Sequence, residues 1–175
     1  MNSTQFEDAK HLTCFDSDVK MKAVFKQNIP HLEYLYLAGG EPRFQLAYVP
    51  LLKMLLDAGK LDVNIQFITN MTGYRYHDVN FFELLDEFKN ATIVGSVDSI
   101  GATFEKIRVG ATWDQVIATR REMMKYSLRF ILQPLVTNLN ISSLHDLHQS
   151  WVQQGFVEKD QVRLLVLTDR KSTRL

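Results

Sequence analysis

The chain has 175 residues, 46% of them hydrophobic, and 20 Lys and Arg balance 20 Asp and Glu to a net charge of zero at pH 7. A chain of this length can bury one hydrophobic core, so we expect one domain over residues 1–175, frayed at 1–9 and with a tail at 169–175. Zero net charge argues against a surface that attracts nucleic acid or an anionic membrane through bulk charge.

Three further features predict a cytoplasmic protein. No apolar run approaches the roughly 20 residues that a membrane-spanning helix needs. The N-terminus is polar and acidic, unlike a signal peptide. Cys14 is the only cysteine, which precludes an internal disulfide and fits a reducing compartment.

Segments with helical periodicity alternate with short apolar runs that are typical of strands. Helices are predicted at residues 16–27, 44–58, 78–88, 112–126 and 143–154. Strands are predicted at residues 31–38, 63–69, 92–97, 128–136 and 161–168. Residues 99–110 are predicted to form a loop and a short turn.

Single residues mark several of these boundaries. Caps are expected from Asp16 or Ser17 for the first helix, Asp78 for the third, and Ser142 or Ser143 for the last. Gly59 and Gly155 are expected to end the helices before them, and Pro134 is expected to interrupt the fourth strand.

Strands that alternate with helices indicate an α/β fold with parallel strands and right-handed crossovers. Two architectures fit this order, namely an open doubly wound sheet and part of a (β/α) barrel. Both place their ligand-binding loops at the carboxyl ends of the strands.

The polar candidates follow the predicted strands. Gly39-Gly40-Glu41 comes after the first strand and Thr69-Asn70 after the second. Ser96 and Asp98 follow the third, and Gln133 lies near the end of the fourth. One shared ligand at one edge of the sheet would explain all of them.

The segment Gly39-Gly40-Glu41-Pro42 is the most distinctive of these. The two glycines accept backbone angles that a Cβ would forbid, and they let a ligand touch the main chain. Pro42 fixes its own φ at a point where a helix can begin. A strand that ends in exposed amides beside an acidic side chain is suited to holding a polar ligand.

These motifs together resemble the radical S-adenosylmethionine (radical SAM) enzymes. Gly39-Gly40-Glu41-Pro42 resembles their GGEP motif, whose backbone contacts the amino group of SAM. Asn70, after Thr69, resembles their TN pair, and Ser96 with Asp98 resembles an S-x-D motif that reaches the carboxylate or ribose of SAM. Arg108, in Ile-Arg-Val-Gly before Trp113, is similar to a segment of relatives with SPASM or twitch extensions.

The resemblance implies a partial (β/α) barrel of the radical SAM type, covering residues 29–168, with SAM as cofactor. In that family a [4Fe–4S] cluster reduces SAM, and the resulting 5′-deoxyadenosyl radical abstracts a hydrogen atom from the substrate. No residue of this chain is assigned a catalytic role. The expected SAM-binding residues are Gly39, Gly40, Glu41, Pro42, Asn70, Ser96, Asp98 and Arg108.

The sequence departs from the family at the cluster. The family's C-x3-C-x2-C loop is missing, because Cys14 has Asp18 and Met21 where the other two cysteines would stand. Thiolates are the usual ligands of such clusters, so this chain is expected to hold neither the cluster nor another metal. We interpret the chain as a piece of a larger protein, a truncated copy, or one half of a split protein.

Simpler structural roles compete with these assignments. Gly39-Gly40 would suit a plain turn, and Ser96 and Asp98 would suit a cap. Arg108 could form a surface ion pair with Glu105, and Asn70 could hydrogen-bond within its own turn. His145 and His148 are close enough on a helix to share a metal, although a solvated helix face is the simpler explanation.

Two functions follow as hypotheses. The first is a segment of a radical SAM enzyme that positions SAM beside a cluster, inactive alone, with an unknown substrate. The second is a non-catalytic remnant, or a SAM-binding or interaction module, with the same partial barrel. An unrelated α/β protein is a third interpretation. The expected partners are SAM, a substrate, and either a missing N-terminal segment or a second copy that covers the open barrel edges.

Overall fold

The computed structural model describes residues 18–45 and 47–166. The expectations for Cys14, for the caps Asp16 and Ser17, and for the segments 1–9 and 169–175 lie outside these residues. None of the described helices is long and apolar enough to cross a membrane.

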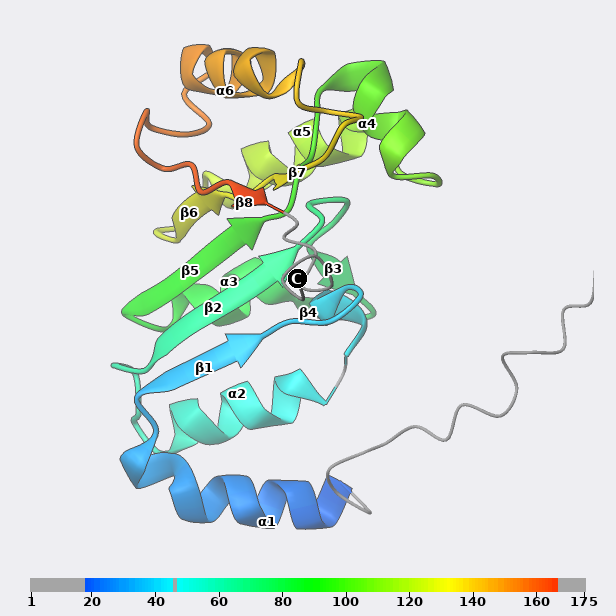
Figure 1. Cartoon of the computed structure of the whole chain (residues 1–175). Coiled ribbons are helices and arrows are strands. Elements are labelled where there is room, and N and C mark those ends of the chain that lie inside the picture. The colour runs from blue at the N-terminus through cyan, green and yellow to red at the C-terminus, as the bar shows by residue number, and fades with distance from the viewer. Residues whose placement is uncertain (1–17, 46, 167–175) are drawn as a thin grey trace, which may run out of the picture.

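Short helices alternate with short strands along most of the chain (Figure 1). The α-helices are α1 (Asp18–Asn28), α2 (Tyr48–Asp57), α3 (Phe81–Asp86), α4 (Gly101–Ile107), α5 (Trp113–Met123) and α6 (Leu144–Gln153). The 3-10 helices are η1 (Ile29–His31) and η2 (Pro42–Phe44). The strands are β1 (Tyr34–Leu37), β2 (Asn64–Thr69), β3 (Arg75–Tyr76), β4 (Val79–Asn80), β5 (Asn90–Gly95), β6 (Arg129–Leu132), β7 (Leu135–Val136) and β8 (Leu165–Val166).

The central sheet decides between the two architectures that the sequence left open. Its four strands are parallel and lie in the order β1-β2-β5-β6, which is their order along the chain. A doubly wound sheet reverses its strand order at a switch point, whereas an unreversed order with right-handed crossovers is that of a barrel. The predicted partial (β/α) barrel is therefore confirmed. Figure 1 shows α2 beside β1, with α1 outside α2.

The core lies between this sheet and its helices. Leu37, Phe67, Ile93 and Phe130 are neighbours in register on the four strands, and each is at most 3% exposed. The ring of Phe67 packs on Phe81 of α3, with 5.4 Å between the ring centroids. Full burial of such side chains stabilises the fold by about 1.5–3 kcal/mol each, so this row holds strands and helices together.

The predicted cap of the third helix is wrong. α3 begins after Asn80, whose side-chain Oδ1 accepts hydrogen bonds from the backbone N–H groups of Phe82 and Glu83. Asp78 lies instead in the turn between β3 and β4, a short antiparallel pair that the sequence did not indicate. Asn and Asp are about equally good caps, so composition alone could not choose between these two positions.

The prediction of a loop over residues 99–110 is also wrong, because α4 occupies most of it. The fully buried ring of Phe104 packs edge-on against Trp113 of α5, with 5.7 Å between the ring centroids. This tertiary contact stabilises a seven-residue helix whose own sequence, starting at Gly101, is a poor helix former.

Other boundaries agree with the sequence. Thr112 caps α5 in a reciprocal capping box with Gln115. Pro134 separates β6 from β7, and β7 pairs in parallel with β8. Ser143 precedes α6 as predicted, but its hydroxyl bonds to the Asn140 carbonyl and to Ser99 and not to a helix amide.

Candidate functional site

The carboxyl ends of the four central strands meet at one edge of the sheet, which we call the carboxyl rim. It comprises Gly39–Arg43 after β1, Thr69–Gly73 from the last residue of β2 onward, Ser96–Asp98 after β5, and Arg108, which contacts Asp98. Two backbone hydrogen bonds extend the sheet into the rim. The N–H of Ser96 donates to Thr69 O, and the N–H of Gln133 donates to Gly95 O, each over 2.8 Å. All the sequence-predicted site residues thus lie along one edge.

The glycine pair presents bare main chain at this rim. Gly39 has a φ of +150°, a conformation that favours glycine, and both Gly39 and Gly40 are exposed. Apart from the adjacent residues, no atom of residues 18–45 and 47–166 lies within 4 Å of the position that a Cβ would take at either glycine. The backbone after β1 is therefore accessible to a ligand, and a side chain there would occupy the space in front of it.

The carboxylate of Glu41 does not face the solvent. Glu41 is only 7% exposed; its Oε1 accepts from the Thr69 hydroxyl over 2.8 Å, and its Oε2 accepts from the Asn70 N–H over 3.0 Å. Burial raises the pKa of this carboxyl, while the hydrogen bonds from Asn70 and Thr69 and the charge of Arg43 act in the opposite direction. Glu41 therefore ties the loop after β1 to the loop after β2.

Pro42 shapes the backbone at the start of η2. It is buried and occupies the first turn of η2, where its fixed φ suits a helix start.

Asn70 uses its side chain within its own turn. Its Oδ1 accepts from the backbone N–H of Thr72 over 2.9 Å and from the Thr72 hydroxyl over 2.6 Å. This is the turn role that the sequence left open as an alternative. Its Nδ2 has no hydrogen-bond partner within residues 18–45 and 47–166.

Asp98, Arg108 and Ser96 form one connected group. The Nε and Nη2 of Arg108 lie 2.8 Å and 2.6 Å from Asp98 Oδ2, and Nη2 also donates to Ser96 Oγ over 3.0 Å. Asp98 Oδ1 accepts from the Leu135 N–H over 2.9 Å, so both carboxylate oxygens are occupied. Arg108 pairs with Asp98 and not with Glu105, the alternative that the sequence left open, while Glu105 accepts from the N–H of Trp113.

Arg108 retains donor capacity. Its side chain is 35% exposed, and no described residue bonds its Nη1. Asp98 thus holds the guanidinium by one edge and leaves the other edge available for an anionic group.

Sequence reasoning missed Asn140, which bonds the backbone of Asp98 in this group. Asn140 is fully buried; its Nδ2 donates to the carbonyl oxygens of Asp98 and Leu135, each over 2.7 Å, and its Oδ1 accepts from the Thr137 N–H over 2.7 Å. It lies in a loop 42 residues after Asp98, so no local pattern could have indicated the contact.

The rim offers open backbone at Gly39 and Gly40 and a free guanidinium edge at Arg108, which suit a polar ligand and not an iron–sulfur cluster. The described residues include no cysteine, and among them no three His, Cys, Asp or Glu side chains are grouped to hold a metal. They do not fit a [4Fe–4S] cluster, which requires thiolates.

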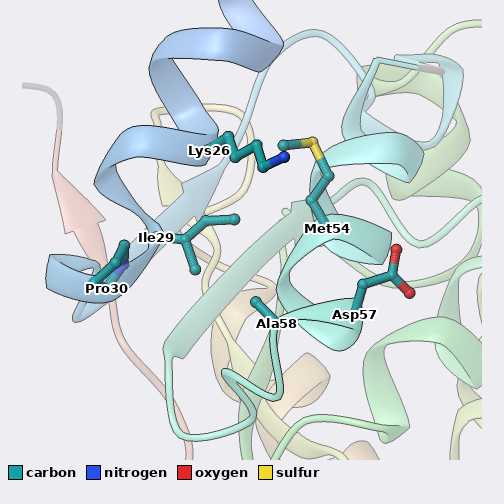
Figure 2. Close-up of a pocket in the computed structure, with 6 residues that line it drawn as sticks. All are labelled: Lys26, Ile29, Pro30, Met54, Asp57 and Ala58. Atoms are coloured by element: carbon teal, nitrogen blue, oxygen red, sulfur yellow. The ribbon is translucent and has the colours of Figure 1, made fainter.

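A cavity of about 450 Å³ lies away from the rim, near the amino ends of β1 and β2. Figure 2 shows its lining from α1, η1 and α2, with Lys26 extending toward Met54. Ile29, Pro30 and Ala58 complete an apolar wall, and Asp57 adds a carboxylate. None of the predicted site residues lines this cavity.

Comparisons with known proteins agree with the fold. The chain has the partial-barrel fold of radical SAM enzymes. It superimposes on anSMEcpe with bound AdoMet at a TM-score of 0.66 and 17% identity, covering 87% of this chain and 43% of that one. The same protein with bound AdoMet and Cp18Cys peptide gives a TM-score of 0.68 at 16% identity, covering 87% and 44%.

A second similar protein is SuiB of Streptococcus suis bound to S-adenosylmethionine. It matches with a TM-score of 0.64 and 14% identity, covering 87% of this chain and 34% of that one. The chain therefore spans less than half the length of these structures, and at such identities the likeness concerns the fold. No protein-family model and no curated protein matches the chain.

Proposed function

We propose that the carboxyl rim binds SAM, and that the chain is a segment of a radical SAM enzyme that positions this cofactor. The observation that carries the proposal is the exposed Gly39-Gly40 backbone, held in place by the buried carboxylate of Glu41. The radical SAM fold of the chain supports it independently, because the segment lies where that fold places the carboxyl ends of its strands.

Each rim residue has a distinct part in this proposal. The main chain of Gly39 and Gly40 receives the amino group of SAM, and the free Nη1 edge of Arg108 pairs with its carboxylate. Ser96 offers its hydroxyl. Asn70 offers its Nδ2 as a donor.

The two carboxylates of the rim act through other residues. Glu41 fixes the loop after β2, and Asp98 orients Arg108, so neither needs to touch the cofactor. Pro42 shapes η2. They are positioning residues in this proposal.

The proposal covers SAM binding and no reaction step. Bound SAM would supply a sulfonium whose bond to the 5′ carbon can be cleaved reductively. The described residues cannot ligate the cluster that delivers the electron, and no residue among them is assigned to hydrogen abstraction.

The missing thiolates favour a second candidate, a SAM-binding or interaction module without a cluster. Anaerobic reconstitution of the chain with iron and sulfide tests whether the chain carries a cluster of its own. A brown, protein-bound chromophore with stoichiometric iron would support an enzyme that carries its own cluster. Colourless protein that still binds SAM would support the module or a segment completed by another chain.

The open edge of the sheet leads to a proposal about partners. Within the central sheet β1 pairs only with β2, and its Tyr34 and Tyr36 are 48% and 57% exposed. An unpaired edge of this kind favours association with further barrel strands or a second copy. We expect light scattering to show self-association of this single-domain chain at high concentration, and a monodisperse monomer would contradict it.

Calorimetric titration with SAM tests the proposed site. We expect the wild-type chain to bind, and Gly40→Ala and Arg108→Ala each to weaken binding by about tenfold or more. Gly40→Ala is informative because the new Cβ would contact no described residue beyond its chain neighbours, so the fold should be unaffected. Lys125→Ala, which removes only an exposed ion pair with Glu122, is the control. Absence of wild-type binding up to about 1 mM would refute the proposed function.

A further inference from the structure

Arg43 follows the GGEP segment directly, and its side chain crosses to the loop after β2. Its Nη2 donates to the Thr72 hydroxyl over 3.3 Å. Its Cζ lies 4.5 Å from the ring centroid of Phe44, which places the guanidinium over that ring. Both contacts hold the guanidinium group, one through a hydrogen bond and the other through the aromatic ring.

Gly73 leaves the room that this guanidinium occupies. A Cβ on Gly73 would stand 2.0 Å from Nη1 of Arg43 and 2.9 Å from its Cζ, far inside any real contact. Residue 73 must therefore lack a side chain for Arg43 to lie where it does. A side chain at residue 73 would displace the guanidinium of Arg43 from its place against this loop.

The loop that receives Arg43 is strained. Met71 is fully buried and has a φ of +62°, which is uncommon for a residue with a side chain. Its N–H donates to Thr69 Oγ1 over 3.1 Å, and the Thr69 hydroxyl in turn donates to Glu41. Such conformations persist where surrounding contacts over-determine them, and they cluster at ligand sites.

Two side chains, Glu41 and Arg43, therefore clamp the same loop from the same segment. Glu41 bonds its beginning, at Thr69 and Asn70, and Arg43 bonds and packs against its end, at Thr72 and Gly73. The Nε of Arg43 is buried without a hydrogen-bond partner among the described residues. Such an unsatisfied donor is costly, so the placement of this side chain is not explained by its own hydrogen bonding.

We propose that Arg43 is a positioning residue, which sets the loop 69–73 against Gly39-Gly40 so that both present their polar groups to one ligand. That this ligand is SAM rests on the proposed function. The clamp itself rests on the contacts of Arg43 with Thr72 and Gly73.

A double-mutant cycle on the full chain tests this role. The variants are Arg43→Ala, Gly73→Ala and the two combined, and the readouts are the SAM dissociation constant and amide hydrogen exchange in residues 70–74. We expect each single variant to weaken SAM binding by about tenfold. The double variant should bind no worse than either single one, because the Cβ at residue 73 and the loss of Arg43 break the same contact.

Two further variants show whether the shape of the Arg43 side chain matters beyond its charge, and whether any arginine in this region would give the same result. Arg43→Lys keeps the charge but not the planar group that fits on Gly73, so it should bind SAM as weakly as Arg43→Ala. It also carries the test if Arg43→Ala fails to fold. Arg75→Ala is the matched control, since this exposed arginine is stacked on Tyr74 in the same region but makes no clamp contact, and it should bind like wild type.

Several results would overturn the proposal. SAM affinity unchanged in Arg43→Ala and Gly73→Ala would leave Arg43 a merely structural residue, and so would additive losses in the double variant. If the wild-type chain binds no SAM, the proposed function fails. Amide hydrogen exchange then shows whether Arg43 holds the loop 69–73 in place. Faster exchange in residues 70–74, equal in the single and double variants, supports that role, and unchanged exchange refutes it.

Discussion

Asp98 holds Arg108 by one edge of its guanidinium. Asp98 Oδ2 lies 2.8 Å from Nε and 2.6 Å from Nη2, while Oδ1 is bound to the backbone N–H of Leu135. The carboxylate is 7% exposed and the guanidinium side chain 35%, so the pair lies at the boundary between core and solvent. One side of the arginine is fixed by the protein and the other can meet a ligand.

Asp98→Asn should therefore weaken SAM binding although Asp98 itself is not a ligand. The amide keeps an acceptor for the Leu135 N–H, but it removes the charge that orients Arg108. We expect the SAM dissociation constant to rise by about tenfold in calorimetric titration. Glu122→Gln, which breaks the exposed ion pair with Lys125, should leave it unchanged. Equal affinity in Asp98→Asn and wild type would mean that Arg108 does not contact the ligand.

Asn140→Ala should destabilise the fold more than an ordinary polar substitution. It would leave the buried carbonyl of Asp98, the partly buried carbonyl of Leu135 and the N–H of Thr137 without their Asn140 partner. Each such loss costs about 1–3 kcal/mol, and we expect about 3 kcal/mol in total by urea unfolding.

Asn64→Ala provides the control for Asn140. The Asn64 side chain donates to the Glu33 carbonyl at an exposed site, where water replaces the lost bond. Its effect should stay within about 0.5 kcal/mol. Similar losses in the two variants would show that Asn140 does not organise the rim.

The positions of the rim residues other than Arg108 could be predicted from the sequence because their polar motifs directly follow apolar strands. Gly39, Asn70 and Ser96 all come within two residues of a strand end. Parallel pairing then brings them to one edge without further information.

The contacts within the rim could not be predicted, because they join residues distant in the chain. Glu41 bonds Thr69, 28 residues away, and Asn140 bonds Asp98, 42 residues away. The same holds for α4, which depends on the packing of Phe104 against Trp113. The sequence shows which polar side chains are available, and only the packed structure shows which of them already bond to other residues of the chain.

Because of buried Glu41, we predict a contribution to the free energy of unfolding that increases as the pH falls, the opposite of the usual behaviour of a paired carboxylate. Burial raises its pKa in the folded state above 4.5, so the folded chain binds this proton more readily than the unfolded chain. The penalty for burying the charge is then fully present above the folded pKa. It is relieved as the pH falls through the folded pKa toward the unfolded value.

Glu41→Gln isolates this contribution, because glutamine does not titrate. The stability of wild type minus that of Glu41→Gln should rise as the pH falls through the folded pKa, and it should be constant at higher pH. Urea unfolding of both proteins from pH 4 to pH 8 measures the difference. A difference that falls toward low pH would indicate a lowered pKa and a carboxylate stabilised by its hydrogen bonds.

Gly95→Ala should destabilise the sheet just below the rim. A Cβ there would stand 2.6 Å from Phe130 Cζ and 3.1 Å from Met71 Cγ. The Phe130 ring cannot easily move aside, because the guanidinium of buried Arg120 lies 4.5 Å from its centroid and Trp151 packs 5.9 Å away. Overpacking of this kind costs about 1–3 kcal/mol, measurable by urea unfolding.

A second substitution shows whether that collision is the cause. Phe130→Leu removes the ring atoms that the new Cβ would meet, so the double variant Gly95→Ala/Phe130→Leu should lose less than the two single losses added together. Gly40→Ala, where a Cβ meets open space, should leave the free energy of unfolding within about 0.5 kcal/mol of wild type. Strictly additive losses would show that the new Cβ does not collide with Phe130. Met71, whose Cγ is the next neighbour of that Cβ, would then be the residue to substitute.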